Sequence, residues 1–165
     1  AGLAMVYPLM KRVFYCPQWV LGLAFSWGIP MVYAAQVGAV PLEAWWLFAI
    51  SVIWALIYDT EYAMVDREDD LRLGLYSSAI LFGRADRIVL AGLQGLMMFL
   101  WAGLAWFSHF GGIFWLAWFL ALLIFVWQLQ RVWSRGREGC FQAFLSNHWL
   151  GMVLFVGVWS AVPHG

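Results

Sequence analysis

Residues 88–107, IVLAGLQGLMMFLWAGLAWF, form an uninterrupted stretch without a charged side chain. A transmembrane α-helix needs about 20 predominantly apolar residues to cross the hydrocarbon core of a bilayer, and this stretch has that length. Five other apolar segments lie on either side of it: Ala1–Met10, Trp19–Ala35, Ala44–Tyr58, Ile113–Trp127 and Trp149–Val162. Several of these are shorter than a full span, so we expect their helices to continue into flanking polar residues.

The composition points to the same class of protein. Of the 165 residues, 65% are hydrophobic, 19% are aromatic and only 11% are charged. Soluble domains usually contain about 45–50% apolar and about 25% charged residues. Because a small soluble domain leaves much of its surface in water, it could not hide this much apolar side chain. We therefore predict an all-α integral membrane protein with a single domain, residues 1–165. The net charge of zero argues against nucleic acid as a partner.

The first apolar segment, Ala1–Met10, is only about half as long as a spanning helix. The sequence begins inside it and without an initiator methionine. We expect a truncated helix followed by about five complete transmembrane helices, with the amino-terminal helices of the same protein missing. Gly28 and Pro30 should bend the first complete span. Cys16 and Cys140 are too few for a disulfide framework, so we expect free thiols.

The basic residues predict the topology. The first connection holds Lys11 and Arg12, the third holds Arg67, Arg72, Arg84 and Arg87, and the fifth holds Arg131, Arg135 and Arg137. The second and fourth connections and the carboxyl-terminal tail hold no lysine or arginine. If each apolar segment crosses once, all nine basic residues fall on one side. This is the positive-inside pattern, which places the odd-numbered connections in the cytoplasm.

The acidic residues are concentrated in one place, because six of the nine lie between Asp59 and Arg72. On a helix, offsets of seven and four residues place Asp59, Asp66 and Asp70 along one face, which Tyr62 shares. Two carboxylates one turn apart repel each other unless a cation lies between them. Mg²⁺ prefers oxygen ligands and typically takes one or two carboxylates together with substrate phosphates. The pattern favours a metal–diphosphate substrate with an apolar tail.

Simpler interpretations remain open for several charged residues. For Glu61, Glu68 and Asp69 we favour a solvated loop whose charges keep it out of the lipid. Lys11 and Arg12 either contact phosphates or only set the topology. Arg67 and Arg72 either meet the same phosphates or pair with the nearby acids. The Arg131–Arg137 cluster is interpreted as topogenic or as a contact for anionic lipid.

The remaining polar residues give weaker signals. The three histidines, His109, His148 and His164, have no partner at metal-ligand spacing. Ser77, Ser78 and Gly83 favour a small-residue packing surface over a catalytic role.

The acidic stretch has a familiar sequence. YDTEYAMVDREDD at residues 58–70, followed by Gly74, Ser78 and AILFG at residues 79–83, closely resembles the second aspartate motif of the UbiA prenyltransferase family. Upstream, the pairs Tyr7-Pro8, Lys11-Arg12 and Pro17-Gln18 look like the branch of this family that prenylates 4-hydroxybenzoate. Near the carboxyl end, Cys140-Phe141 with Ala143, Phe144 and Asn147 is similar to that branch too. The resemblance covers essentially the whole chain, and the order and spacing of the motifs agree.

This resemblance implies a bundle of nine membrane helices around a cavity that opens laterally to lipid. It implies a bacterial inner-membrane enzyme with its two aspartate motifs on the cytoplasmic side, where both hold Mg²⁺ ions that bridge the diphosphate of a polyprenyl donor. The implied acceptor is 4-hydroxybenzoate, prenylated ortho to its hydroxyl in ubiquinone biosynthesis.

The resemblance also implies roles for individual residues. By position, Asp66 and Asp70 would be the metal-binding residues of the second motif and, with Asp59, catalytic. Lys11, Arg67, Tyr62 and Tyr7 would contact the substrates.

One departure from the family is large. Its first motif, Asn-Asp-x-x-Asp-x-x-x-Asp, belongs to helices that precede Ala1, and it is absent from this sequence. We therefore expect no turnover by the 165 residues alone. Two alternatives stay open: a different aromatic acceptor, such as a homogentisate or naphthoate derivative, or a non-catalytic membrane subunit or transporter whose acidic loop only attracts cations.

Overall fold

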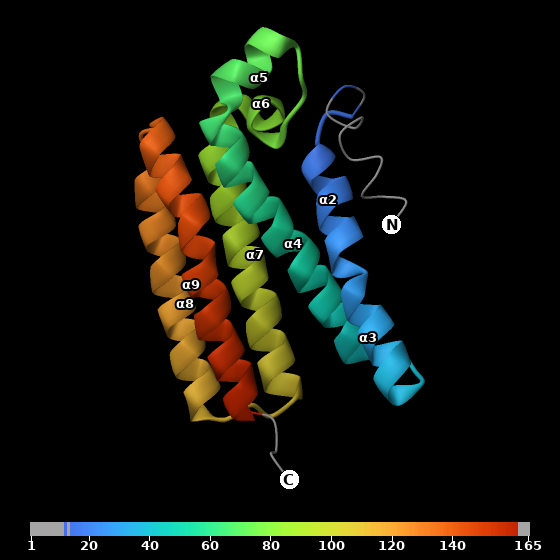
Figure 1. The fold of residues 1–165 in the computed structure, drawn as a ribbon. Helices are drawn as coiled ribbons and strands as arrows, with labels where there is room; N and C mark the ends of the chain where they lie inside the picture. The colour runs from blue at the N-terminus through green and yellow to red at the C-terminus, as the bar shows by residue number, and fades with distance from the viewer. Residues whose placement is uncertain (1–11, 13, 162–165) are drawn as a thin grey trace.

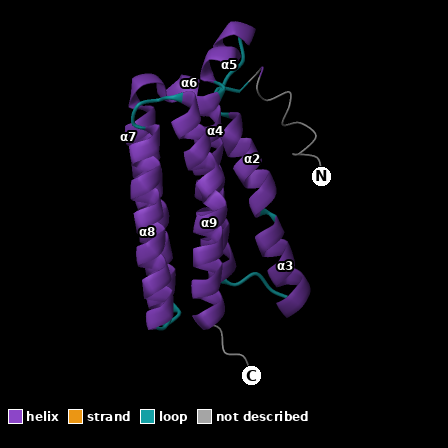
Figure 2. Cartoon of the chain, turned by 60° about the vertical axis from the view of Figure 1, so that its left-hand side comes forward, coloured by secondary structure: helices purple, strands orange, loops and turns teal. Residues whose placement is uncertain are grey.

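The computed structural model of the protein describes residues 12 and 14–161, and every regular element in that part is helical (Figures 1 and 2). The elements are α2 (Pro17–Ser26), α3 (Gly28–Val37), α4 (Leu42–Val65), α5 (Arg67–Leu73), α6 (Ser78–Phe82), the 3-10 helix η1 (Gly83–Ala85), α7 (Asp86–Phe107), α8 (Gly112–Val132) and α9 (Arg137–Ala161). The all-α prediction is confirmed.

Five helical segments are long and apolar enough to cross a membrane, judged by length and composition: Pro17–Val37, Leu42–Val65, Ser78–Phe107, Gly112–Val132 and Arg137–Ala161. Each one contains or largely covers one predicted apolar segment and continues into polar residues, as expected. The largest extension is in α9, which begins at Arg137 although its apolar segment begins at Trp149.

The helices run alternately up and down, with α8 and α9 side by side (Figure 1). Helix α4 contacts α2, α7 and α9, so it lies at the centre of the described part of the chain. Large side chains such as Phe114, Phe125 and Leu150 are buried between helices. Others, such as Phe99 and Trp106, are more than 70% exposed (72% and 74%). A chain with so many exposed aromatic rings requires an apolar solvent, which a lipid bilayer provides.

The first span is divided at Trp27, where α2 ends and α3 begins. Pro30 lies in the first turn of α3 and has no N–H, so it cannot donate to the carbonyl oxygen of Ser26 as a regular helix would require. The break lies where Gly28 and Pro30 predicted a bend.

Close helix packing depends on two glycines of α9. A Cβ atom at Gly157 would lie 2.7 Å from the Cβ of Ala117 in α8. A Cβ atom at Gly151 would lie 2.7 Å from Cη2 of Trp54 in α4. Both distances are shorter than carbon atoms tolerate, so the neighbours of α9 approach it this closely only because these positions lack a side chain.

One end of the bundle, which we call the aspartate end, contains the end of α4, α5, α6, η1, the start of α7, the end of α8 and the start of α9 (upper end in Figure 1). The seven arginines from Arg67 to Arg137 lie in these segments. The connections at the other end, residues 38–41 and 108–111, contain no lysine or arginine.

The short helix α6 closes this end against α4 and α2. Ser77 and Ser78 are both buried, the Ser78 backbone N–H donates to Oε1 of Gln18 at 3.0 Å, and the hydroxyls of Ser78 and Thr60 lie 2.8 Å apart. The predicted packing surface of Ser77, Ser78 and Gly83 is confirmed for the two serines, whereas a Cβ at Gly83 would meet nothing within 4 Å.

Candidate functional site

The aspartate segment, residues 59–70, is helical except at Asp66, where α4 ends and α5 begins. The Asp66 N–H donates to the Tyr62 carbonyl at 3.2 Å, and the Asp70 N–H donates to the Asp66 carbonyl at 2.8 Å. Helical hydrogen bonding therefore continues through the joint. Because each bond joins residues four apart, Tyr62, Asp66 and Asp70 share one face, as their spacing predicted.

The carboxylates of this segment differ in their exposure. Asp70 is only 5% exposed, whereas the side chains of Asp66 and Asp69 are 27% and 46% exposed. Among the residues that the structure describes, no group of three or more His, Cys, Asp or Glu side chains could hold a metal ion. A metal at this segment would therefore take one or two of these carboxylates and further oxygen ligands from elsewhere.

A second carboxylate site, which we call the Asp86 cluster, lies beside this segment and was not predicted. Arg135 donates to the Asp86 carboxylate from Nη2 at 2.6 Å and from Nε at 2.9 Å. Arg67 donates from Nη1 at 3.0 Å, and the Arg87 backbone N–H donates at 2.7 Å. The Asp86 side chain is 0% exposed. These bonds raise the pKa of the Arg135 guanidinium, so it remains charged, and they join α5, α7 and the α8–α9 connection.

The Asp86 cluster determines the position of Arg67, one of the predicted substrate contacts. Arg67 pairs with Asp86, which lies 19 positions away in the sequence. It also lines a cavity of about 340 Å³ with Met64, Leu71 and Arg135. Arg72, in contrast, pairs with the nearby Asp69 at 3.8 Å.

Arg137, the first residue of α9, reaches the aspartate segment from the other side. Its Nη2 lies 3.3 Å from Oδ2 of Asp69 and 3.9 Å from Oδ1 of Asp66. The sequence suggested only a topological or lipid-binding role for the cluster that contains Arg137. Its contact with the carboxylates joins residues about 70 positions apart, and no local pattern signals it.

Glu61 is the clearest correction to the sequence-based interpretation, which placed it in a solvated loop. Its side chain is 0% exposed, and its Oε2 accepts a hydrogen bond from Nδ2 of Asn147 at 2.7 Å. Oδ1 of the same Asn147 accepts from Nε1 of Trp54 at 3.0 Å. Glu61 points away from the Asp66 face because neighbouring positions on a helix lie on different sides. It therefore bridges α4 and α9.

Aromatic rings line the surface next to Asp66. The rings of Tyr62 and Phe144 lie 5.0 Å apart, and Phe144 stacks with Phe141 at 6.3 Å. Tyr62, Asp66, Arg137 and Phe141 also line a common cavity of about 330 Å³. With Glu138, which also lines this cavity, the structure places two carboxylates, a guanidinium and two aromatic rings around one space.

Two of the predicted substrate contacts, Tyr7 and Lys11, lie outside the described residues. Both cysteines are free thiols, as expected, and both are buried. Burial raises the pKa of the Cys16 thiol above its usual range.

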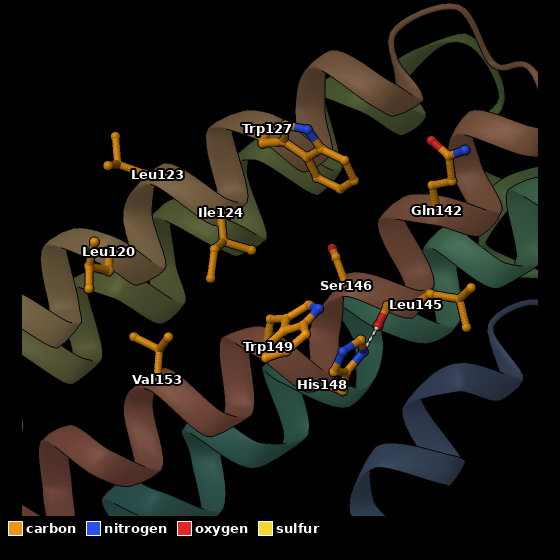
Figure 3. Close-up of a pocket in the computed structure, with 10 residues that line it drawn as sticks. All are labelled: Leu120, Leu123, Ile124, Trp127, Gln142, Leu145, Ser146, His148, Trp149 and Val153. Atoms are coloured by element: carbon orange, nitrogen blue, oxygen red, sulfur yellow. Dashed lines mark hydrogen bonds between the residues drawn. The ribbon is translucent and has the colours of Figure 1, made fainter.

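A cavity of about 700 Å³ lies away from the carboxylates, in a groove between α8 and α9 (Figure 3). Its walls are mostly apolar, with Leu120, Ile124 and Trp127 on α8 facing Trp149 and Val153 on α9. His148 lies at its edge, and its Nδ1 is hydrogen-bonded to the carbonyl oxygen of Leu145 (Figure 3). The described residues that line this groove include no Asp, Glu, Lys or Arg.

The fold and the site together define a class: an integral membrane protein of apolar helices with a carboxylate-rich site at one end. Comparison with known proteins identifies the family within this class. The model of a family described as the UbiA prenyltransferase family matches residues 1–156. The chain belongs to this family.

Individual relatives agree with this assignment. The chain is 53% identical to a protein named 4-hydroxybenzoate octaprenyltransferase from Chromohalobacter salexigens, over 95% of this chain and 53% of the relative. It is 49% identical to a protein of the same name from Aeromonas hydrophila, over 94% and 54%. It is 47% identical to another from Salmonella paratyphi C, over 99% and 56%. The chain thus spans about half the length of these curated relatives.

A solved structure supports the fold. The apo structure of a UbiA homolog from Aeropyrum pernix K1 superimposes with a TM-score of 0.74, covering 96% of this chain and 60% of that chain. At 20% sequence identity, this likeness concerns the fold alone.

Proposed function

We propose that the chain is the carboxyl-terminal part of an enzyme that transfers a polyprenyl group from polyprenyl diphosphate to 4-hydroxybenzoate, ortho to its hydroxyl, in ubiquinone biosynthesis. The family and the names of the relatives support this reaction. The observation that carries it in the structure is the pair Asp66 and Asp70, one helical turn apart at the end of a membrane-length helix.

The donor set of this pair fits Mg²⁺. This ion is usually held by one or two carboxylates plus waters and substrate phosphates, and not by a cage made of protein alone. Asp66 and Asp70 would hold the ion. Its positive charge would neutralise the negative charge of the diphosphate as that group leaves.

The chain's own residues would position and stabilise the reacting groups. The carbon–oxygen bond of the donor breaks, its electron pair leaves with the diphosphate, and an electron-rich ring carbon of the acceptor forms the new carbon–carbon bond and then loses its proton. Tyr62 and Phe141, which line the same cavity as Asp66, would present ring faces to the allylic cation. Asp59, Tyr7, Lys11 and Arg67 are the further proposed contacts with the substrates.

The rest of the longer protein would complete the site. The family's first aspartate motif and the missing amino-terminal helices would supply the second set of carboxylates and close the cavity. We therefore propose that residues 1–165 alone do not turn over.

We further propose a location in the bacterial inner membrane, with the aspartate end in the cytoplasm. The support is that the seven arginines from Arg67 to Arg137 all lie in segments of that end.

The test uses full-length protein in liposomes, with radiolabelled 4-hydroxybenzoate and a prenyl diphosphate. Asp66→Ala and Asp70→Ala should each lower prenylation by about 100-fold or more, because losing even an outer partner of a metal ligand typically costs about 10–100-fold. Removing Mg²⁺ with a chelator should abolish turnover.

Glu68→Ala is the matched control, because Glu68 is exposed on the same short helix, and it should retain activity. Wild-type rates in both aspartate variants would refute the proposal, and parallel assays with homogentisate and a naphthoate test the choice of acceptor.

A further inference from the structure

Arg137 is held near the aspartate segment by contacts that are easily exchanged. Its Nη2 lies 3.3 Å from Asp69 and 3.9 Å from Asp66, while its side chain remains 66% exposed. Exposed ion pairs of this kind contribute little to stability, because water and salt compete for both partners. The guanidinium is therefore a cation placed between two carboxylates without being locked there.

The backbone next to Arg137, in contrast, is firmly anchored. Arg135, two residues earlier, donates three hydrogen bonds to the buried Asp86 and a fourth, from Nη2, to the Arg84 carbonyl at 2.8 Å. The Cys140 N–H donates to the Gly136 carbonyl at 3.0 Å, which begins the helical bonding of α9. The side chain of Arg137 thus extends from a fixed point, and only its flexible end needs to move.

Arg137 also stands between two cavities. One, of about 340 Å³, contains Arg67 and Arg135, and the other, of about 330 Å³, contains Tyr62 and Asp66. Arg137 and Val65 are the residues that line both. Arg137 therefore borders the cavity that contains Tyr62 while it also contacts Asp69.

We infer that Arg137 is an exchangeable counter-ion of the aspartate segment and a diphosphate-binding residue. Before substrate arrives, it neutralises Asp66 and Asp69. When a divalent cation binds at Asp66 and Asp70, its charge repels the guanidinium from Asp66. The guanidinium then donates to phosphate oxygens, a group that arginine binds in bidentate fashion. This inference rests on the proposed prenyl diphosphate substrate and adds a residue of the α8–α9 connection to its site.

The experiment measures two affinities of the full-length protein in detergent. The first is for Mn²⁺ alone, from the electron paramagnetic resonance signal of the free ion. The second is for geranyl thiodiphosphate, an unreactive donor analogue, at saturating Mg²⁺. In Arg137→Gln, Mn²⁺ should bind about 2- to 5-fold more tightly, because a competing cation is gone. The analogue should bind about 10-fold or more weakly, because charge-assisted hydrogen bonds to phosphate are lost.

Two further variants separate this role from a structural one. Arg131→Gln removes the same charge from an exposed arginine that stacks on Trp127 and should leave both affinities unchanged. Arg137→Lys keeps the charge without the planar fork, so Mn²⁺ affinity should stay at the wild-type value while analogue affinity is only partly lost.

The outcomes are distinct. Opposite changes in the two affinities of Arg137→Gln support the inference. The inference is overturned if the two affinities of Arg137→Gln equal those of Arg131→Gln, or if both affinities of Arg137→Gln are weaker than those of the wild type. Either result leaves the prenyltransferase proposal intact. Failure of the wild-type protein to bind the analogue with Mg²⁺ would overturn the proposed function and this inference together.

Discussion

At the residue scale, Glu61 shows how position on a helix separates neighbours in the sequence. It lies between Asp59 and Tyr62 in an acid-rich stretch, yet it is buried and paired with Asn147, 86 residues away. A buried carboxylate in a membrane-length helix is costly unless hydrogen-bonded. The Asn147 amide reduces this cost, and Asn147 in turn accepts a hydrogen bond from Trp54.

We predict that Glu61→Ala destabilises the full-length protein and that Glu61→Gln largely does not. The alanine variant leaves the Asn147 amide without its carboxylate partner, whereas glutamine still offers a carbonyl oxygen. Interhelical hydrogen bonds in membrane proteins contribute about 0.6–2 kcal/mol, and we expect a loss of this size. Unfolding in mixed micelles with increasing SDS measures it. If both variants were as stable as the parent protein, the hydrogen bond from Asn147 to Glu61 would contribute nothing to stability.

Much of the aspartate segment could be predicted from its residues, because its geometry is local. The spacing of Asp66 and Asp70 placed them on one face, and the backbone hydrogen bonds of the structure agree. Asp86 and Arg137 could not be found in this way. Their partners Arg67, Asp69 and Arg135 lie on α5 and in the α8–α9 connection, and only the packing of segments distant in the sequence brings them together.

At the scale of elements, α8 and α9 form a closely packed pair because a glycine of α9, Gly157, faces an alanine of α8, Ala117. The missing side chain of Gly157 leaves room for Ala117 and Phe114, since an added Cβ would lie 2.7 Å and 3.3 Å from them. Packing of small residues is a main source of helix association in membranes, where the hydrophobic effect gives no net drive.

We predict that Gly157→Ala destabilises the protein by about 1–3 kcal/mol, the usual cost of overpacking a core. Combining it with Ala117→Gly moves the methyl group from one helix to the other and should recover a large part of the loss. The free energy of unfolding of the two single variants and the double variant measures this coupling. Additive losses would mean that the two helices are not in contact at this point.

The helix bounds illustrate what hydropathy leaves undetermined. The hydropathy pattern located five membrane-spanning helices, because lipid requires long apolar stretches. Hydropathy did not show that α9 begins at Arg137, because residues 137–148 mix charged, polar and apolar side chains. These roughly three turns of mixed helix are stabilised by partners elsewhere, such as Gln128, which donates to Ser146 at 2.9 Å.

At the scale of the whole molecule, the aspartate end and the opposite end must face different compartments. The native cysteines are buried, so single introduced cysteines can report the orientation. We predict that Ser134→Cys reacts with a membrane-impermeant maleimide only in inside-out vesicles, and that Ser108→Cys reacts only in right-side-out vesicles. The parent protein serves as the unlabelled control. Reaction of both positions from the same side would contradict an odd number of crossings between them.

The Asp86 cluster also has a consequence for the order in which the protein is made. Arg135 follows Asp86 by 49 residues, and chains emerge from the ribosome at about 5–20 residues per second. For several seconds, therefore, a nascent chain carries Asp86 with only Arg67 and Arg87 to neutralise it. The cluster is completed only after α8 has been synthesised, so the aspartate end can be assembled only when the α8–α9 connection has left the ribosome.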